Sequence, residues 1–317
     1  MGHLERGVWF PDDNFPTDKA GAFLRAAASF RGRVSSDGST PHPVAAGRYV
    51  LYVSYACPWA HRTLIARALL GLEDAIEIAV VHPYMGRDGW SFAEGDGVVP
   101  DPIHAAAFLR DVYVAAAPDY TGRVTVPVLW DRVAHTIVCN ESREILRMLS
   151  TELASLGHGR RELAPVALRE RIDAVIDQNY NPINNGVYRA GFARSQAAYE
   201  AAVHPLFDAL AYWEEVLAKQ RFTCGAQLTE ADICLFTTLL RFDAVYHGHF
   251  KCNLRRIIDL PNLWGFVRDV YQTPGVAATC RLDHIKTHYY RSHTHINPSG
   301  VVPAGPVIDF DAPHGRG

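Results

Sequence analysis

The stretch Tyr55–Arg62 (Tyr-Ala-Cys-Pro-Trp-Ala-His-Arg) contains residue types that could do nucleophilic chemistry. Residues 48–54 before it are β-branched and aromatic, which predicts a strand. Apolar residues after it recur at helical spacing, so Cys57 is expected at a strand-to-helix turn with Pro58 in the first helical turn. Unpaired backbone N–H groups and the helix dipole at such a turn favour the reactive thiolate.

Cys57 has no second cysteine at the position where a redox pair would place one. A Cys-x-x-Cys pair resolves its own mixed disulfide, but Ala60 stands three residues after Cys57. An outside thiol must therefore resolve a disulfide formed on Cys57, and glutathione is the obvious candidate. The alternative is a buried, inert cysteine. The strand–Cys-Pro–helix context is unusual for such a residue.

The composition excludes several classes of protein. The chain has 317 residues, 48% of them hydrophobic, and a formal net charge of −3. That length suits two modest domains or one large one. A negative net charge gives no reason to expect electrostatic attraction to nucleic acid or to an anionic membrane. The polar, acidic N-terminus shows no secretory signal, and the six scattered cysteines fit a reducing compartment, so we expect a cytoplasmic protein.

Four histidines near the C-terminus raise the question of a metal site. They are His284, His288, His293 and His295, at spacings of 4, 5 and 2. These spacings do not suit one helix face throughout, and no paired thiolates accompany them. We therefore expect a solvated tail and no metal.

The pattern along the chain predicts four segments. Residues 1–47 look like an extension with one short helix at 19–30. Residues 48–157 alternate strands and helices, beginning with a βαβ unit. Residues 158–290 have only helical patterns, including a capping box at 229–232, and residues 291–317 look like a surface tail.

Two further features of residues 48–157 suit an extended anionic ligand. Pro127 interrupts a strand-like run, and an edge pairing that starts there would free the backbone of Val126. Asn140 is a good helix N-cap, and the amides of Glu141 and Ser142 would then form an anion site. Together with a thiolate turn, these features match a γ-glutamyl tripeptide thiol.

A mixed α/β domain followed by an all-helical domain resembles a cytosolic glutathione transferase, with a thioredoxin-like first domain. The detailed match is to the glutathionyl-hydroquinone reductases of the Xi class. It is carried by five groups of residues over nearly the whole chain: 57–62 (CPWAHR), 124–131 (VTVPVLWD), 140–142 (NES), 185–193 (NGVYRAGFA), and 296–298 with 300–303 (INP, GVVP).

The resemblance implies a role for each matched residue. Cys57 would be the nucleophile and Tyr188 the proton donor or acceptor, while Tyr246 and Tyr289 would point hydroxyls toward Cys57. The glutathione-binding residues would be Trp90, Arg123, Val124, Thr125, Val126, Glu141 and Ser142. Taken without the resemblance, Tyr246 and Tyr289 would more often be core or rim residues, as tyrosines in a helical domain usually are. Trp90 could be a hydrophobic anchor, and Glu141 an acid that favours the helix dipole.

The implied activity is removal of glutathione from a glutathionyl-hydroquinone, with glutathione as co-substrate and a homodimer as the assembly. An Omega-like transferase with thioltransferase or dehydroascorbate reductase activity is the alternative enzyme, although the match through residues 185–193 argues against it. A transferase-like fold used as an assembly module is the non-enzyme alternative. Such modules often lose the nucleophile, so the presence of Cys57 argues for an enzyme.

Overall fold

The computed structural model describes residues 2–11, 15–159 and 161–316. The chain forms two compact units. The first comprises Met1–Asn14, Ala26–Arg161 and Asp283–Gly300, and the second comprises Phe15–Arg25, Glu162–Leu282 and Val301–Gly317. The four segments expected from the sequence stay a prediction.

The first unit is built on a four-stranded sheet in the order β4-β3-β6-β7. Strands β3 (Tyr49–Val53) and β4 (Ile76–Val80) are parallel, whereas β6 (Val128–Asp131) runs antiparallel to β3 and to β7 (Thr136–Cys139). All five residues of β3 are buried, as expected for a central strand with both faces covered.

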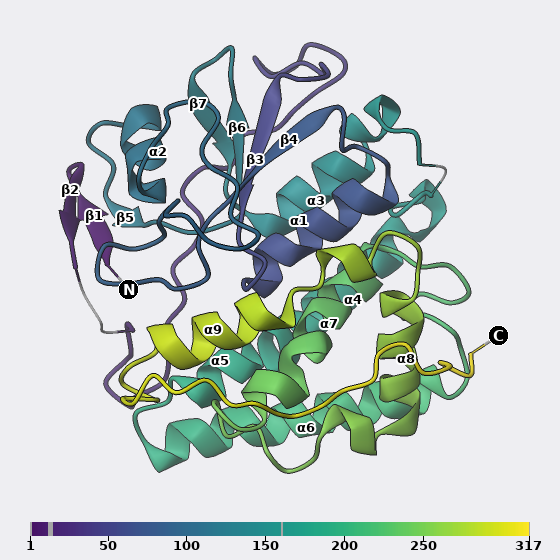
Figure 1. Cartoon of the computed structure of the whole chain (residues 1–317). Helices are drawn as coiled ribbons and strands as arrows, with labels where there is room; N and C mark the ends of the chain where they lie inside the picture. Colours follow the sequence, from purple (N-terminus) through teal and green to yellow (C-terminus); the bar gives the residue numbers. More distant parts are fainter. Residues whose placement is uncertain (1, 12–14, 160, 317) are drawn as a thin grey trace. The chain divides into compact units, whose positions relative to one another are not determined.

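Helices cover this sheet. Helices α1 (Pro58–Leu69) and α3 (Ser142–Ser150) pack against each other, and α2 (Leu109–Ala116) lies on the other side of the strands (Figure 1). The unit also contains α9 (Leu282–Ser292), whose first residue belongs to the second unit, and a short 3-10 turn at Leu153–Leu156. A second sheet has the order β2-β1-β5, in which β1 is His3–Glu5, β2 is Val8–Phe10 and β5 is Gly122–Arg123.

The second unit is helical, as the sequence predicts. Its main helices are α4 (Arg169–Asn179), α5 (Gly186–Gly191), α6 (Gln196–Leu217), α7 (Glu230–Arg241) and α8 (Pro261–Tyr271). Two π-helical turns, η3 (Tyr180–Asn184) and η4 (Phe242–Tyr246), continue α4 and α7. Short 3-10 turns lie at Val166–Leu168, Ile257–Asp259 and Ala277–Thr279.

The predicted capping box at the start of α7 is confirmed. Thr229 is the N-cap, and the Asp232 carboxylate accepts a hydrogen bond from the Thr229 backbone N–H at 2.8 Å. No helix in the part of the chain that the structure describes combines the length and apolar character needed to cross a membrane.

The helix expected over residues 19–30 is wrong, because the structure has no helix there. The Asp18 side chain accepts hydrogen bonds from the backbone N–H groups of Ala20 and Ala22, both at 2.9 Å. Gly21 has a φ of +85°, outside the helical region. An aspartate that bonds its own downstream backbone forms a turn in competition with the helix.

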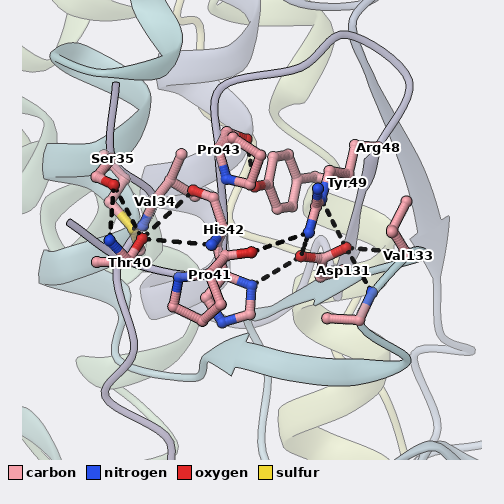
Figure 2. Close-up of polar contacts among 12 residues, drawn as sticks. Val34, Ser35, Thr40, Pro41, His42, Pro43, Arg48, Tyr49, Asp131 and Val133 are labelled. Atoms are coloured by element: carbon pink, nitrogen blue, oxygen red, sulfur yellow. Dashed lines mark hydrogen bonds and ion pairs between the residues drawn. The ribbon is translucent and has the colours of Figure 1, made fainter. Parts of the chain in front are cut away.

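The end of β6 is fixed by the carboxylate of Asp131, whose exposed fraction is 0%. Figure 2 shows the polar contacts around it. Arg48 donates to it from Nε at 2.8 Å and from Nη2 at 2.6 Å, and His42 Nδ1 lies 2.7 Å away. The backbone N–H groups of Val133 and Ala134 also donate to Asp131 Oδ1. Burial would raise the pKa of Asp131, but the hydrogen bonds from Arg48 and His42 outweigh it and hold the pKa at about 2.

We predict that Asp131→Asn lowers the free energy of unfolding at pH 7 by on the order of 3 kcal/mol, because it leaves the Arg48 guanidinium without its carboxylate. The folded-state pKa lies below the unfolded value of about 3.9, so this stabilisation is complete above that value and is lost as the pH falls toward 2. Urea denaturation of the unchanged protein and of Asp131→Asn should therefore give free energies of unfolding that differ at pH 7 and differ less at pH 3. The exposed Asp119→Asn is the control, and a deficit that is constant with pH would contradict the assignment.

Candidate active site

Cys57 occupies the predicted turn between β3 and α1. It is the N-cap of α1, with φ −80° and ψ 121°, and Pro58 follows at the first helical position. Its carbonyl oxygen accepts the first helical hydrogen bond, from His61 N at 2.9 Å. The Cys57 side chain makes no capping hydrogen bond to α1. Instead the partly exposed thiol donates to the Val126 carbonyl oxygen, with Sγ and O 3.7 Å apart.

The backbone next to Val126 is held by a buried tyrosine. Tyr113 Oη, from α2, donates to the Thr125 carbonyl oxygen at 2.8 Å. Asn140 Nδ2 in turn donates to Tyr113 Oη at 3.0 Å, and Asn140 Oδ1 accepts from the Phe30 backbone N–H. Burial raises the pKa of Tyr113 to about 12, so the hydroxyl stays protonated at neutral pH. The segment that faces Cys57 is thus tied to α2 and to the start of α3.

The N-cap of α3 is Glu141 rather than Asn140, which corrects the sequence-based expectation by one residue. The Glu141 carboxylate accepts from the Arg143 backbone N–H at 3.2 Å and from Ser142 Oγ at 3.4 Å. The Asn140 side chain is taken up by the contacts just described. The Glu141 amide, expected to bind an anion, donates to Cys139 Sγ at 3.4 Å.

Arg62 is a residue of this site that the sequence reasoning missed. It lies on α1 with an exposed fraction of 2%, and its guanidinium stacks over Trp59 at 4.4 Å. Arg62 Nη1 donates to Ser142 Oγ at 3.5 Å, while Nε has no partner among the described residues. A buried cation is costly unless an anion compensates it. The position of Arg62, five residues after the predicted nucleophile in the same helix, was a signal that could have drawn attention to it.

The remaining predicted residues of the first unit lie on three segments. Trp90 is buried in the loop before α2, and its ring stacks on that of His288 with centroids 4.7 Å apart. Arg123 is the last residue of β5, where it lies opposite His3 of β1. The chain then runs through the buried Val124 to Val126. Tyr289 is buried on α9.

Tyr188 and Tyr246 both belong to the second unit. Tyr188 lies on α5 and Tyr246 in η4, and their ring centroids are 6.0 Å apart. Both rings also contact Phe250, at 5.6 and 5.5 Å. Arg25, which the sequence did not single out, places its guanidinium 4.8 Å from the Tyr188 ring and donates to Asn185 Oδ1 at 2.7 Å. The two tyrosines therefore share one aromatic cluster.

Of the two glycines in the motif at residues 185–193, Gly191 stands where packing leaves no room for a side chain. A Cβ on Gly191 would lie 2.2 Å from the Phe250 ring, a distance that no side chain tolerates. The absence of a side chain at this position lets the aromatic cluster around Tyr188 close.

The expectation of a solvated histidine tail is wrong. His284, His288 and His293 are all buried in the first unit. Within the described residues, no group of three or more His, Cys, Asp or Glu side chains is arranged to hold a metal ion. The rings of His284 and His288 hydrogen-bond carbonyl oxygens of a loop about two hundred residues earlier, and a local spacing rule does not detect such tertiary contacts.

Comparison with known proteins identifies the class. A family model described as the glutathione S-transferase N-terminal domain matches residues 56–152, and one described as the C-terminal domain of the same family matches residues 196–269. The chain belongs to the glutathione transferase family.

The similarity to individual members is extensive. The glutathionyl-hydroquinone reductase YqjG of Escherichia coli is 50% identical over 100% of this chain and 98% of its own length. The glutathionyl-hydroquinone reductase PcpF of Sphingobium chlorophenolicum is 50% identical over 97% of each chain. A Xi class transferase structure from Natrialba magadii has a TM-score of 0.94 and 52% identity, covering 100% of this chain and 96% of the other. The glutathione-bound structure of YqjG has a TM-score of 0.90 and 48% identity, covering 99% of each. Within the transferases, the chain is therefore a member of the Xi class.

We predict that Cys57 is the thiol that alkylating reagents label first at pH 7. Burial raises the pKa of four other thiols. The pKa rises to about 12 for Cys139 and Cys280, and it is also raised for Cys224 and Cys252. Cys234 is buried. Iodoacetamide should therefore add one group quickly to the native protein, and peptide mass spectrometry should place it on Cys57. Cys57→Ala should remove this fast phase; faster labelling of any other cysteine would contradict the assignment.

Proposed function

We propose that this protein is a glutathione-dependent reductase that removes glutathione from glutathionyl-hydroquinones. The observation that carries the proposal is the placement of Cys57, a partly exposed thiol at the N-cap of α1, facing the Val126 carbonyl at 3.7 Å and without a second cysteine at Ala60. Such a thiol forms a mixed disulfide that an outside thiol must resolve. Two relatives at 50% identity carry the name of this activity.

In the first step, the Cys57 thiolate attacks the sulfur of the glutathionyl-hydroquinone. A sulfur–sulfur bond forms and the bond between sulfur and the ring carbon breaks, with its electron pair leaving on carbon. An aryl carbanion is a poor leaving group, but a keto tautomer of the ring lets the carbon leave as part of an enolate. Tyr188 would assist by moving a proton at the ring. The products are free hydroquinone and a Cys57–glutathione disulfide.

In the second step, the thiolate of another glutathione attacks the sulfur of the bound glutathione. Oxidised glutathione leaves, and the displaced electron pair restores the Cys57 thiolate. Because the hydroquinone departs before the second glutathione reacts, the kinetics should be ping-pong.

The glutathione site that we propose lies in the first unit. The Val126 backbone would pair with the extended tripeptide, and the start of α3 at Glu141 and Ser142 would hold the γ-glutamyl end. A ligand carboxylate near Ser142 would also compensate the buried charge of Arg62. The remaining residues proposed to contact glutathione are Trp90, Arg123, Val124 and Thr125. Tyr246 and Tyr289 are proposed to direct their hydroxyls to the Cys57 sulfur.

Reduction of small mixed disulfides or dehydroascorbate is the second candidate. It is favoured by a relative from Schizosaccharomyces pombe named glutathione S-transferase omega-like 2, which is 44% identical over 93% of this chain and 96% of its own length. This chemistry needs the same Cys57 and glutathione, but no proton transfer at a ring.

The proposed function predicts that Cys57→Ser abolishes turnover without loss of the fold. A serine hydroxyl is not ionised at neutral pH, so it cannot replace the thiolate. The assay incubates the protein with glutathione and a glutathionyl-hydroquinone and follows free hydroquinone by chromatography. Cys224→Ser, at another partly exposed cysteine, is the control and should retain activity. Absence of hydroquinone release by the unchanged protein would refute the function itself.

Tyr188→Phe should separate the two candidate activities. Cleavage of the carbon–sulfur bond should fall by on the order of 10²-fold, a typical contribution of general acid–base catalysis, while reduction of a small mixed disulfide should stay within a few fold. Both activities are measured on one preparation. Tyr212→Phe removes an exposed hydroxyl from α6 and is the matched control. An equal fall in both activities would make Tyr188 a structural residue.

Two wider properties belong to the same proposal. We expect a homodimer, as the resemblance implies, and light scattering at micromolar concentration should give twice the chain mass; a monomer mass would contradict this. We also expect the protein to work in the cytoplasm, where thiols are kept reduced and glutathione is supplied.

A further inference from the structure

Helix α9 has three polar side chains on one face, which we call the α9 face: His284, His288 and Ser292. Their spacing of four residues places them one above the other along the helix. All three belong to the first unit, together with the irregular loop at residues 83–96 that carries Trp90.

Each residue of the α9 face contacts the backbone of this loop. The contacts are His288 Nδ1 to the Pro83 carbonyl oxygen at 3.0 Å, the Met85 backbone N–H to Ser292 Oγ at 3.0 Å, and His284 Nε2 to the Asp96 carbonyl oxygen at 2.7 Å. The contacts therefore reach both ends of the loop.

These hydrogen bonds determine which nitrogen of each ring carries a hydrogen atom. A carbonyl oxygen only accepts, so His288 must carry hydrogen on Nδ1 and His284 on Nε2. Both histidines are buried, with exposed fractions of 7% and 2%. Pro83 is buried as well, so its carbonyl would be left without a hydrogen bond and shielded from water if it lost the donor on His288.

The ring of His288 also contacts the side chain of Trp90 directly. The two rings stack with centroids 4.7 Å apart and an interplanar angle of 20°. His288 thus holds the loop backbone at Pro83 and the indole seven residues later. His284 makes a second connection, because its ring meets Tyr55 edge-on at 5.5 Å, two residues before Cys57.

We propose that His288 is a positioning residue for Trp90, and that the α9 face holds the 83–96 loop in the conformation that binds glutathione. The inference rests on the proposed glutathione site. The loop contains Gly86, Gly89 and Gly95, and glycine loses the most conformational freedom when it is ordered. Contacts that order the loop before the ligand arrives remove this cost from binding.

Three substitutions of His288 separate its two contacts. His288→Asn keeps a donor near the position of Nδ1 and loses the stacked ring. His288→Phe keeps a ring over Trp90 and loses the donor, and His288→Ala loses both. On a Cys57→Ser background, calorimetric titration with glutathione should give roughly tenfold weaker binding for the alanine variant and smaller losses for the other two. In the protein with Cys57, KM for glutathione should rise while kcat stays within about twofold.

Two controls distinguish positioning from general destabilisation. His42→Ala removes another buried histidine of the first unit, which contacts Asp131 rather than the loop, and should leave glutathione affinity unchanged. In a Trp90→Ala background, His288→Ala should weaken binding much less than it does when Trp90 is present. Ser292→Ala is the mildest test of the α9 face, because it removes one acceptor from Met85.

The outcomes are separable from those of the proposed function. If the Cys57→Ser protein does not bind glutathione at all, the proposed site fails and this inference with it. If that protein binds glutathione and the three His288 variants bind equally well, only the role of His288 is overturned. If His288→Ala weakens glutathione binding equally in the presence and absence of Trp90, the role of His288 is overturned as well. Should His288→Ala not fold, the asparagine, phenylalanine and Ser292→Ala variants decide the question.

Discussion

The antiparallel pairing of β3 with β6 is the interaction on which the first unit depends. Tyr52 lies opposite Val128, so the end of β3 meets the beginning of β6. The chain leaves β3 toward Cys57 and enters β6 from Val126, and this register brings the thiol to the Val126 carbonyl. A slip of one residue would turn every side chain of β6 to the other face of the sheet. The position of the nucleophile is therefore a consequence of strand register as well as of the helix that follows it.

The two ends of β6 are fixed by different chemistry. At its end, Asp131 accepts charged and backbone donors that hold its pKa at about 2. Just before β6 begins, the neutral hydroxyl of Tyr113 donates a hydrogen bond to the Thr125 carbonyl and accepts one from the Asn140 side-chain amide. Charge-assisted bonds are suited to anchoring, because breaking one leaves a buried charge. The uncharged hydrogen-bond network near Cys57 orients the backbone without placing a charged side chain beside Val126.

The sequence predicted the elements whose causes are local. The strand before Cys57, Pro58 at the first helical position and the capping box at Thr229 follow from neighbouring residues alone. The expected helix at 19–30 is wrong because the Asp18 side chain competes for the backbone. Asn140 was expected to cap α3 because Asn is a preferred N-cap, but its side chain bonds Phe30 and Tyr113 instead, and these are long-range contacts. The contacts of Arg62, Arg25 and His288 join residues far apart in the chain, so no periodicity could have indicated them.

The buried guanidinium of Arg62 has a consequence for ligand binding. Among the described residues, its guanidinium makes one hydrogen bond, to Ser142 Oγ at 3.5 Å, and stacks over the Trp59 ring at 4.4 Å. An apolar side chain of similar volume would often be as stable or more stable at such a site. If glutathione binds at the start of α3 as proposed, its carboxylate brings a further negative charge next to Ser142, beside that of Glu141. The electrostatic cost of Arg62 in the free protein would then be relieved on binding, and its relief would add to the affinity for an anionic thiol over a neutral one.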